Sequence, residues 1–251
     1  MKEKIYTIPV NEAYEKACGC PLCHLEEQLE KDAVDYALGA AMMEPDYRLE
    51  SNKKGYCRTH FQQLFDSPNK LSLALTLDTH LEELRKTLSA YEKEALHPGG
   101  EKKGFLKKKP QFAEKLCGAL ETVAHSCVIC EKIEYTMQRY IDVLFYLWQH
   151  DDAFKKKFKA SAGLCLPHMR QVCACAEKHL NQQKAAEFLA ALFSLQQQQL
   201  DKLQEDIHRF TLKFDYRNKD MEWGDAKDAP IRTIETIAGY LRRKEESSPP
   251  V

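Results

Sequence analysis

The stretches Gly55-Tyr-Cys57-Arg-Thr-His60 and Gly163-Leu-Cys165-Leu-Pro-His168 share one pattern, a cysteine and a histidine two residues apart with a glycine just ahead. Each stretch follows a Cys-x-x-Cys pair, Cys20-Pro-Leu-Cys23 in the first case and Cys127-Val-Ile-Cys130 in the second. The intervening segment has 33 residues in the first set and 34 in the second. Repetition at a fixed period indicates a duplicated structural unit. The sequence therefore predicts two related units, each with its own pair of motifs.

The repeated residues are of the types that bind zinc. Zinc prefers four sulfur or nitrogen ligands in a tetrahedron, and a two-residue gap turns both ligands of a pair to the same side. Helix starts stabilise thiolates through free N–H groups and partial positive charge, so two helix starts converging on one metal is a sound arrangement. If the pairs of each copy converge, the first site has the ligands Cys20, Cys23, Cys57 and His60, and the second has Cys127, Cys130, Cys165 and His168.

We therefore predict two structural Cys3His zinc sites, because four protein ligands leave no open position for a substrate. An iron–sulfur cluster remains the alternative cofactor, since three cysteines and one histidine can also hold a cluster. Cys18 and His125 each stand two residues before a CxxC pair and are candidates for spare ligands or supporting groups.

Apolar residues recur with helical period along both copies. After Cys20 and Cys127 they fall at steps of three and four, which is the pattern of a helix with one buried face. These residues are Leu22, Leu25, Leu29, Ala33, Tyr36, Ala37 and Ala40 in the first copy, and Ile129, Ile133, Met137, Tyr140, Ile141, Leu144, Phe145 and Trp148 in the second. A short helix after His60 is expected to stop at Asp66-Ser67-Pro68, before a longer one. No run alternates long enough for a strand, so we predict an all-α protein.

Proline and glycine residues suggest the domain boundaries. Residues 1–96 form the first expected unit, and the Pro-Gly-Gly stretch opens a linker over residues 97–110. Residues 111–243 form the second unit, whose last helix, residues 231–243, is expected to pack across it. That helix carries the apolar residues Ile234, Ile237, Ala238 and Leu241 on one face. The polar, proline-containing residues 244–251 are expected to be a disordered tail.

Bulk properties narrow the class of protein. The 251 residues carry a net charge of −1, which provides no global field for nucleic acid or an anionic membrane. The basic run from Lys102 to Lys109 is local and suits a linker, so nucleic-acid binding is not favoured. The N-terminus lacks the pattern of a secretory signal, and no apolar run has the length of a membrane span. We expect a cytoplasmic protein, where ten cysteines point to metal or thiol chemistry.

The segment around residues 213–232 is dense in aromatic and charged residues. One interpretation is a polar loop that folds the last helix back by ion pairs. The alternative is a surface for a protein partner, because aromatic and arginine side chains anchor many interfaces. The candidate anchors are Tyr216, Arg217, Trp223 and Arg232.

The chain resembles an uncharacterised bacterial family with duplicated CxxC and CxxH motifs. The resemblance rests on the motifs at residues 20–23, 55–60 and 163–168, on Lys213-Phe-Asp-Tyr-Arg-Asn-Lys-Asp220 and on Arg232-Thr-Ile-Glu-Thr-Ile-Ala-Gly239. It implies a bacterial cytoplasmic protein of unknown function. It supplies no activity, so no catalytic role is carried over. We therefore expect a non-catalytic binding or regulatory module. The alternatives are a thiol-based redox sensor or oxidoreductase that uses a CxxC pair, and an enzyme whose catalytic residues the sequence does not identify.

Overall fold

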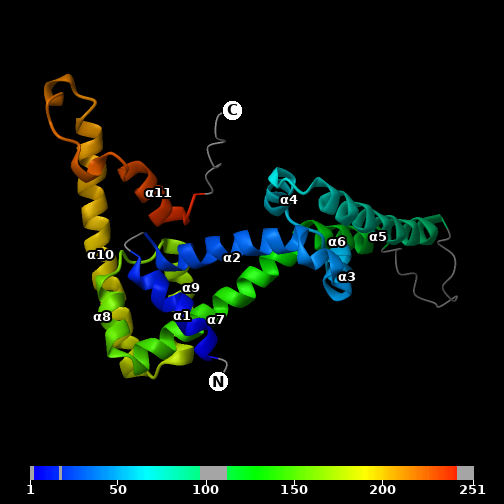
Figure 1. Cartoon of the computed structure of the whole chain (residues 1–251), viewed down its shortest axis with the longest axis horizontal. Coiled ribbons are helices and arrows are strands. Elements are labelled where there is room, and N and C mark those ends of the chain that lie inside the picture. The colour runs from blue at the N-terminus through cyan, green and yellow to red at the C-terminus, as the bar shows by residue number, and fades with distance from the viewer. Residues whose placement is uncertain (1–2, 17–18, 97–111, 242–251) are drawn as a thin grey trace, which may run out of the picture. The chain divides into compact units, whose positions relative to one another are not determined.

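The structure, a computed structural model, describes residues 3–16, 19–96 and 112–241 (Figure 1). Across these ranges the chain forms eleven α-helices and three short 3-10 helices, and no strand. The all-α prediction is confirmed. The expected linker at residues 97–110 and the expected tail at residues 244–251 lie outside the described ranges.

The chain forms two compact units. Unit 1 contains residues 1–28 and 136–251, and unit 2 contains residues 29–135. The division falls inside helix α2 (Pro21–Leu38) and helix α7 (Val128–His150). These units are not the consecutive segments 1–96 and 111–243 expected from the sequence. The sequence of unit 2 therefore interrupts that of unit 1, and helices α2 and α7 each contribute residues to both units.

Unit 1 is built around an aromatic core. Its helices, besides the start of α2 and the end of α7, are α1 (Glu3–Glu15), α8 (Asp152–Ala160), α9 (Leu166–His179), α10 (Gln182–Leu212) and α11 (Ala229–Ala238), with the 3-10 helices η2 (Tyr216–Asn218) and η3 (Gly224–Ala226). Trp148 and Phe188 pack edge to face with ring centroids 5.1 Å apart, and Phe158 contacts both rings. All three side chains are fully buried. Burial of each such side chain stabilises the fold by roughly 1.5–3 kcal/mol.

Unit 2 contains the rest of α2, the 3-10 helix η1 (Ala40–Met43), α3 (Pro45–Lys54), α4 (Arg58–Asp66), α5 (Lys70–Leu96), α6 (Phe112–His125) and the start of α7. The short helix α4 ends where the sequence predicted, at Asp66, and the longer α5 follows. Helices α3 and α5 pack together, and the imidazole Nδ1 of His80 on α5 lies 2.7 Å from the carbonyl oxygen of Asn52 on α3. This packing fixes the turn that leads into the first CxxH motif.

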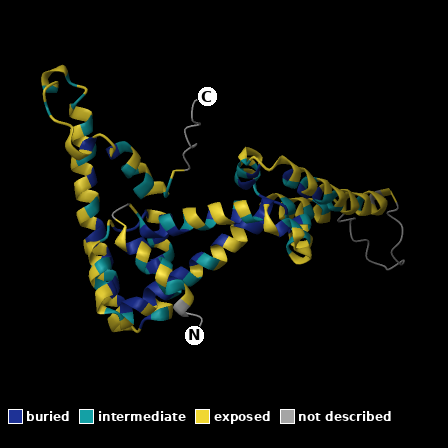
Figure 2. Ribbon diagram, viewed as in Figure 1, coloured by how far each residue is buried: buried dark blue, intermediate teal, exposed yellow. Residues whose placement is uncertain are grey.

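Helix α11 corrects two expectations. It ends at Ala238 rather than running to Arg243. Its apolar side was expected to be the packing face, but Ile234 and Ile237 are 45% and 56% exposed. Figure 2 shows exposed residues along this helix. The helix packs instead through the buried Ala229 and through a set of ion pairs made by Arg232. A polar face therefore lies against α10, and the apolar stripe lies at the surface of unit 1.

Candidate metal centres

Four helix starts carry the eight predicted ligands. Each motif stands at the start of one helix: α2, α4, α7 or α9. The first ligand of the motif directly precedes the helix, and the second ligand lies in its first turn. This placement turns both side chains of a pair toward the end of the helix, where backbone N–H groups are unpaired. At α7, the amide nitrogen of Cys130 lies 3.5 Å from the Cys127 sulfur. The expectation that the motifs open helices is confirmed.

The eight residues form two compact clusters, but not in the predicted pairing. Site A, in unit 1, consists of Cys20, Cys23, Cys165 and His168. Site B, in unit 2, consists of Cys57, His60, Cys127 and Cys130. Each cluster joins the CxxC of one set to the CxxH of the other. The prediction that each set closes its own site is therefore wrong, although all eight residues do gather in Cys3His groups.

Helix length explains the exchange of partners. Helix α2 has 18 residues and is about 27 Å long, so it carries the chain well away from its first turn, where Cys23 lies. Helix α3 has ten residues and can return the chain by only about 15 Å. The second set repeats this mismatch, with a 23-residue α7 followed by a nine-residue α8. With these helices formed, neither CxxH motif lies in the same cluster as the helix start that precedes it in the sequence.

The spacing of the donor atoms in both clusters suits tetrahedral coordination of one metal ion. Within each cluster all four ligand atoms lie within 4.8 Å of one another. In site A, the Nδ1 atom of His168 lies 3.2 Å from Cys165 Sγ, 3.4 Å from Cys23 Sγ and 3.6 Å from Cys20 Sγ. Bond lengths of about 2.3 Å to sulfur and 2.0–2.1 Å to nitrogen give tetrahedral edges of about 3.5–3.8 Å. The donor set and spacing therefore fit zinc.

Site B has nearly the same geometry. The Nδ1 atom of His60 lies 3.2 Å from both Cys57 Sγ and Cys127 Sγ, and 3.4 Å from Cys130 Sγ. The Cys57 and Cys130 sulfurs are 3.7 Å apart. The two sites differ in exposure, because Cys130 is exposed whereas three of the four residues of site A are buried.

A glutamate on α2 supports the histidine of each cluster. The Nε2 atom of His60 lies 3.0 Å from the buried Glu30 carboxylate, and the Nε2 atom of His168 lies 3.5 Å from Glu26. A carboxylate behind a ligating imidazole fixes its tautomer and orientation and strengthens it as a ligand. No motif in the sequence singles out these two glutamates. The only signal was their position, three and seven residues after Cys23 on one helix.

The ionisable groups of site B shift one another's pKa values. Burial opposes protonation of His60, but its contacts with Cys127 and Glu30 outweigh burial and raise its pKa to about 10. Burial likewise opposes ionisation of Cys127, but the His60 contact prevails and lowers the pKa of that thiol to about 6. Burial and the neighbouring thiolates raise the pKa of Cys130 far above its ordinary value.

Site A shows the same division of charge. Hydrogen bonds from Cys20 and Cys23 lower the pKa of Cys165 far below its ordinary value, whereas the pKa of Cys23 is strongly raised by its contact with Cys165. The pKa of His168 rises to about 10, since its contacts with Cys165 and Cys20 outweigh its burial. Without a metal, each cluster thus shares protons between its thiols and its imidazole. A bound divalent cation would replace the shared protons.

Of the other candidate ligands, Cys18 lies outside the described residues, and His125 takes no part in either cluster. His125 lies on α6, with a largely exposed side chain 3.6 Å from Glu121. Of the expected partner-binding residues, Tyr216 is 86% exposed, Arg217 pairs with Asp215, and Trp223 packs against Phe210. Arg232 is engaged in ion pairs within unit 1.

None of the described helices is both long enough and apolar enough to cross a membrane. In the comparison with known proteins, the model of a family described as a "Family of unknown function (DUF6062)" matches residues 1–244. No curated protein and no solved structure matches the chain.

Proposed function

The chain belongs to the DUF6062 family, and we propose that it is a zinc-binding scaffold whose two metal centres each hold one helical unit together as part of a non-catalytic binding or regulatory module. The observation that carries this proposal is the twofold occurrence of one ligand set. Both clusters place three sulfurs around an imidazole Nδ1 at tetrahedral spacing, and both support the imidazole Nε2 with a carboxylate. Structural zinc centres in proteins are built in this way.

The ligand count argues for a structural role. Four protein ligands fill the tetrahedral shell of zinc and leave no position for water or substrate. When bound, zinc would cross-link two helix starts that are far apart in sequence. Binding of structural zinc releases about 10–16 kcal/mol, whereas a whole domain is typically stable by about 5–15 kcal/mol. Each unit should therefore depend on its metal for folding.

Metal analysis of the purified full chain tests the proposal. We expect two zinc atoms per chain, falling to one in the Cys20→Ser, Cys23→Ser variant and to one in the Cys127→Ser, Cys130→Ser variant. Cys117→Ser is the matched control, because Cys117 is an exposed cysteine of α6 outside both clusters. Iron accompanied by sulfide, or a folded chain with no metal, would overturn the proposal.

Thiol chemistry is the second candidate, and the exposure of Cys130 favours it. A thiolate that ligates zinc can be oxidised, and oxidation would release the metal. If this hypothesis is correct, the zinc-loaded, folded protein loses metal rapidly from site B on exposure to a mild oxidant. If the thiols of both sites react only after a chelator has removed the metal, the redox role fails.

We also propose that a protein partner binds at the segment around η2. Support comes from the exposure of two large aromatic side chains, Phe214 at 76% and Tyr216 at 86%. Exposed aromatic residues of this kind serve as anchors at interfaces. Because Arg217 and Arg232 both pair with aspartates, we place the anchor at Tyr216. A Tyr216→Ala, Arg217→Ala variant should keep its zinc and its thermal stability.

A further inference from the structure

Helices α5 and α6 of unit 2 form a hairpin whose outer part buries no side chain. Beyond His80, none of the described side chains of α5 is buried, and the same holds for the described side chains of α6. The two helices pack together, and Lys115 Nζ on α6 lies 3.0 Å from the Glu94 carboxylate on α5. Helices in proteins are stabilised mainly by burial of an apolar face, so a hairpin without buried residues is incomplete as a packed element.

Both helices have apolar residues at the two core positions of a heptad repeat. In coiled coils and four-helix bundles these two positions, named a and d, both face the core. The apolar residues at position d are Leu77, Leu84 and Tyr91 on α5, and Leu116 and Val123 on α6. Those at position a are Leu81 and Leu88 on α5, and Ala113 and Leu120 on α6. The hairpin therefore has the sequence pattern of two helices from a bundle.

Only one of these two positions is covered. The five residues at position d are half-buried by packing within unit 2, whereas the four residues at position a are exposed. The exposed fraction is 57% for Leu81, 45% for Leu88 and 46% for Leu120. A hairpin with position d covered and position a open is half of a four-helix bundle. A second hairpin of the same kind would complete it.

The charges beside the exposed leucines of α5 favour a second copy as the partner. Asp78, Arg85 and Glu92 recur every seven residues, so they form one line next to Leu81 and Leu88 and alternate in sign. All three are exposed, and within the described residues none of them takes part in an ion pair. Parallel pairing of two copies in register would place each charge against itself. In an antiparallel pair centred on Leu81, Asp78 of each copy meets Arg85 of the other.

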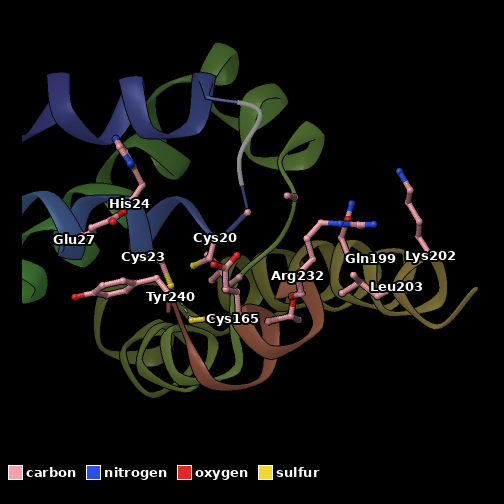
Figure 3. Close-up of a pocket in the computed structure, with 15 residues that line it drawn as sticks. Cys20, Cys23, His24, Glu27, Cys165, Gln199, Lys202, Leu203, Arg232 and Tyr240 are labelled. Atoms are coloured by element: carbon pink, nitrogen blue, oxygen red, sulfur yellow. Dashed lines mark hydrogen bonds between the residues drawn. The ribbon is translucent and has the colours of Figure 1, made fainter. Parts of the chain in front are cut away.

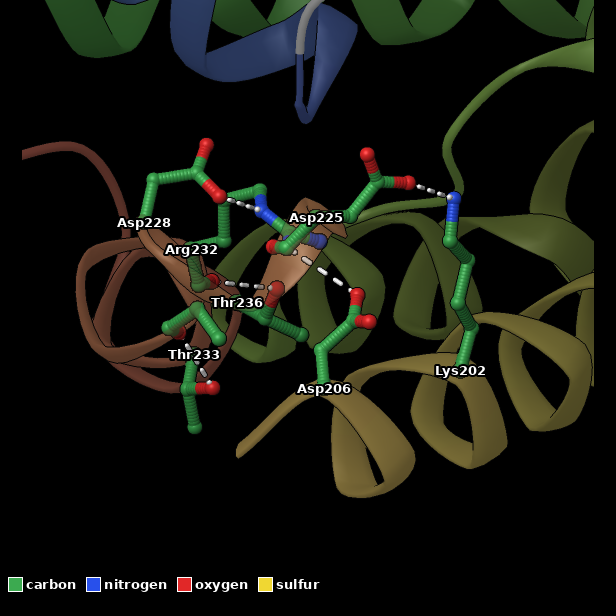
Figure 4. A network of polar contacts seen from close by, with 8 residues as sticks. Lys202, Asp206, Asp225, Asp228, Arg232, Thr233 and Thr236 are labelled. Carbon is green, nitrogen blue, oxygen red and sulfur yellow. Dashed lines mark hydrogen bonds and ion pairs between the residues drawn. The ribbon is translucent and has the colours of Figure 1, made fainter. Parts of the chain in front are cut away.

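The exposed apolar stripe of α11 in unit 1 lacks this pattern. The polar side of that helix, which includes Arg232, lines a cavity of about 480 Å3 beside site A (Figure 3). Arg232 lies 3.0 Å from Asp206 and 2.9 Å from Asp228 (Figure 4). The other charged residue of α11, Glu235, also has a partner. Helix α11 therefore offers a second copy no unpaired charge, and its stripe is a suitable control surface.

We propose that the α5–α6 hairpin is a dimerisation surface, at which two copies of the chain pair antiparallel about Leu81 and form a four-helix bundle. Each hairpin covers the exposed residues at position a of the other. Asp78 and Arg85 form two symmetric ion pairs across the twofold axis, and twofold dimers are the commonest soluble homo-oligomers. The inference is independent of the proposed function, because none of the pairing residues is a metal ligand.

Sedimentation equilibrium of the full, zinc-loaded chain tests the inference. We expect a reversible dimer with twice the chain mass of 29.0 kDa. The Leu81→Glu, Leu88→Glu variant should dimerise about 100-fold more weakly or worse, because both substitutions would bury an unpaired charge in the bundle core. The Ile234→Glu, Ile237→Glu variant is the matched control. It makes the same change at two exposed residues of α11 and should dimerise like the unmodified chain.

An exchange of charges tests the antiparallel pairing. Arg85→Asp places two aspartates against each other in each pair and should weaken the dimer about tenfold. The Asp78→Arg, Arg85→Asp variant makes the pairs complementary again and should regain the affinity of the unmodified chain. Zinc content and helical circular dichroism establish that each variant is folded. Both residues are exposed, so these variants test the dimer even if the leucine variant does not fold.

Several results would overturn the proposal. A folded chain that is monomeric at every concentration measured would mean that another molecule, or none, covers position a. A dimer that persists in the folded Leu81→Glu, Leu88→Glu variant, or that dissociates in the α11 control, would place the contact elsewhere. If the exchange of charges fails to restore the dimer weakened by Arg85→Asp, the antiparallel pairing about Leu81 is wrong.

Discussion

Each histidine of the two centres is held from both sides. Its Nδ1 atom faces three sulfurs, and its Nε2 atom faces a glutamate of α2. The imidazole therefore has one orientation and one tautomer that satisfy all its neighbours. At this scale the ligand types decide what can bind, and the supporting carboxylate decides how tightly.

Double substitutions can verify which motifs share a metal. In the observed pairing, Cys23 and Cys165 belong to one site, so the Cys23→Ser, Cys165→Ser variant should keep one zinc per chain. Cys23 and Cys57 belong to different sites, so the Cys23→Ser, Cys57→Ser variant should lose both metals. Elemental analysis gives the count. The opposite result, one zinc in the second variant and none in the first, would restore the pairing within each sequence set.

The buried Glu30 should contribute strongly to zinc affinity. We expect Glu30→Gln to weaken site B by about 10–100-fold, the usual effect of removing the carboxylate behind a ligating histidine. Competition with a chromogenic zinc chelator measures the affinity. Glu26→Gln is the matched comparison, and we expect a smaller loss at site A because Glu26 is more exposed and 3.5 Å from its histidine. Equal affinity of Glu30→Gln and the unmodified chain would contradict a role for Glu30.

Among the elements, the turns into the CxxH helices have a strict requirement. Gly55 and Gly163, each two residues before a ligand cysteine, have positive φ angles of 64° and 77°. At Gly55 an added Cβ would lie 2.8 Å from the ring of His80. The glycine that recurs ahead of both motifs is thus explained by backbone conformation and by a close neighbour.

Substituting this glycine should loosen unit 2. With ψ at −150°, Gly55 occupies a region open almost only to glycine, so we expect Gly55→Ala to destabilise the unit by about 1–3 kcal/mol in urea unfolding. Gly118 on α6 is a control of opposite sign. Its added Cβ meets nothing within 4 Å, and alanine in a helix interior is favoured over glycine by about 0.5–1 kcal/mol. Destabilisation of equal size in both variants would argue against the conformational explanation.

The sequence predicted the helices better than it predicted which motifs share a metal. The apolar stripes after Cys20 and Cys127 correctly predicted helices, because Leu22, Leu25, Ile129 and Leu144 are buried at helical spacing. The pairing of motifs could not be predicted from the spacing. Segments of 33 and 34 residues allow a CxxH motif to share a metal with the preceding CxxC motif or with the other one. Helix length decided the outcome, and the boundaries of α3 and α8 were not evident in the sequence. The apolar stripe of α11 did not predict its packing face, whereas the interpretation that ion pairs fold the last helix back agrees with the contacts of Arg232.

At the scale of the whole molecule, each metal would cross-link one unit internally, because the four ligands of each site lie within a single unit. All ligands of site A lie in residues 1–28 and 136–251, and all ligands of site B lie in residues 29–135. Losing one metal should therefore affect one unit and spare the other. The internal duplication stays a prediction from the sequence.

Hydrogen exchange measured by mass spectrometry would show this independence. We expect the Cys57→Ser, Cys130→Ser variant to exchange on the order of 100-fold faster or more in α3 and α4, with α9 and α10 unchanged. The Cys20→Ser, Cys165→Ser variant should show the reverse pattern. A uniform rise in exchange along the chain in either variant would mean that the two units unfold together.

The long separation between Cys23 and Cys165, 142 residues, also has a consequence for synthesis on the ribosome. At about 5–20 residues per second, the first half of site A waits roughly 7–30 s for its second half to be translated. During that interval the nearest CxxH motif available to the waiting thiols is the one at residues 57–60, which belongs to site B. A nascent chain that captures zinc too early can therefore close the wrong loop, and correct maturation requires that the ion exchange ligands or arrive late.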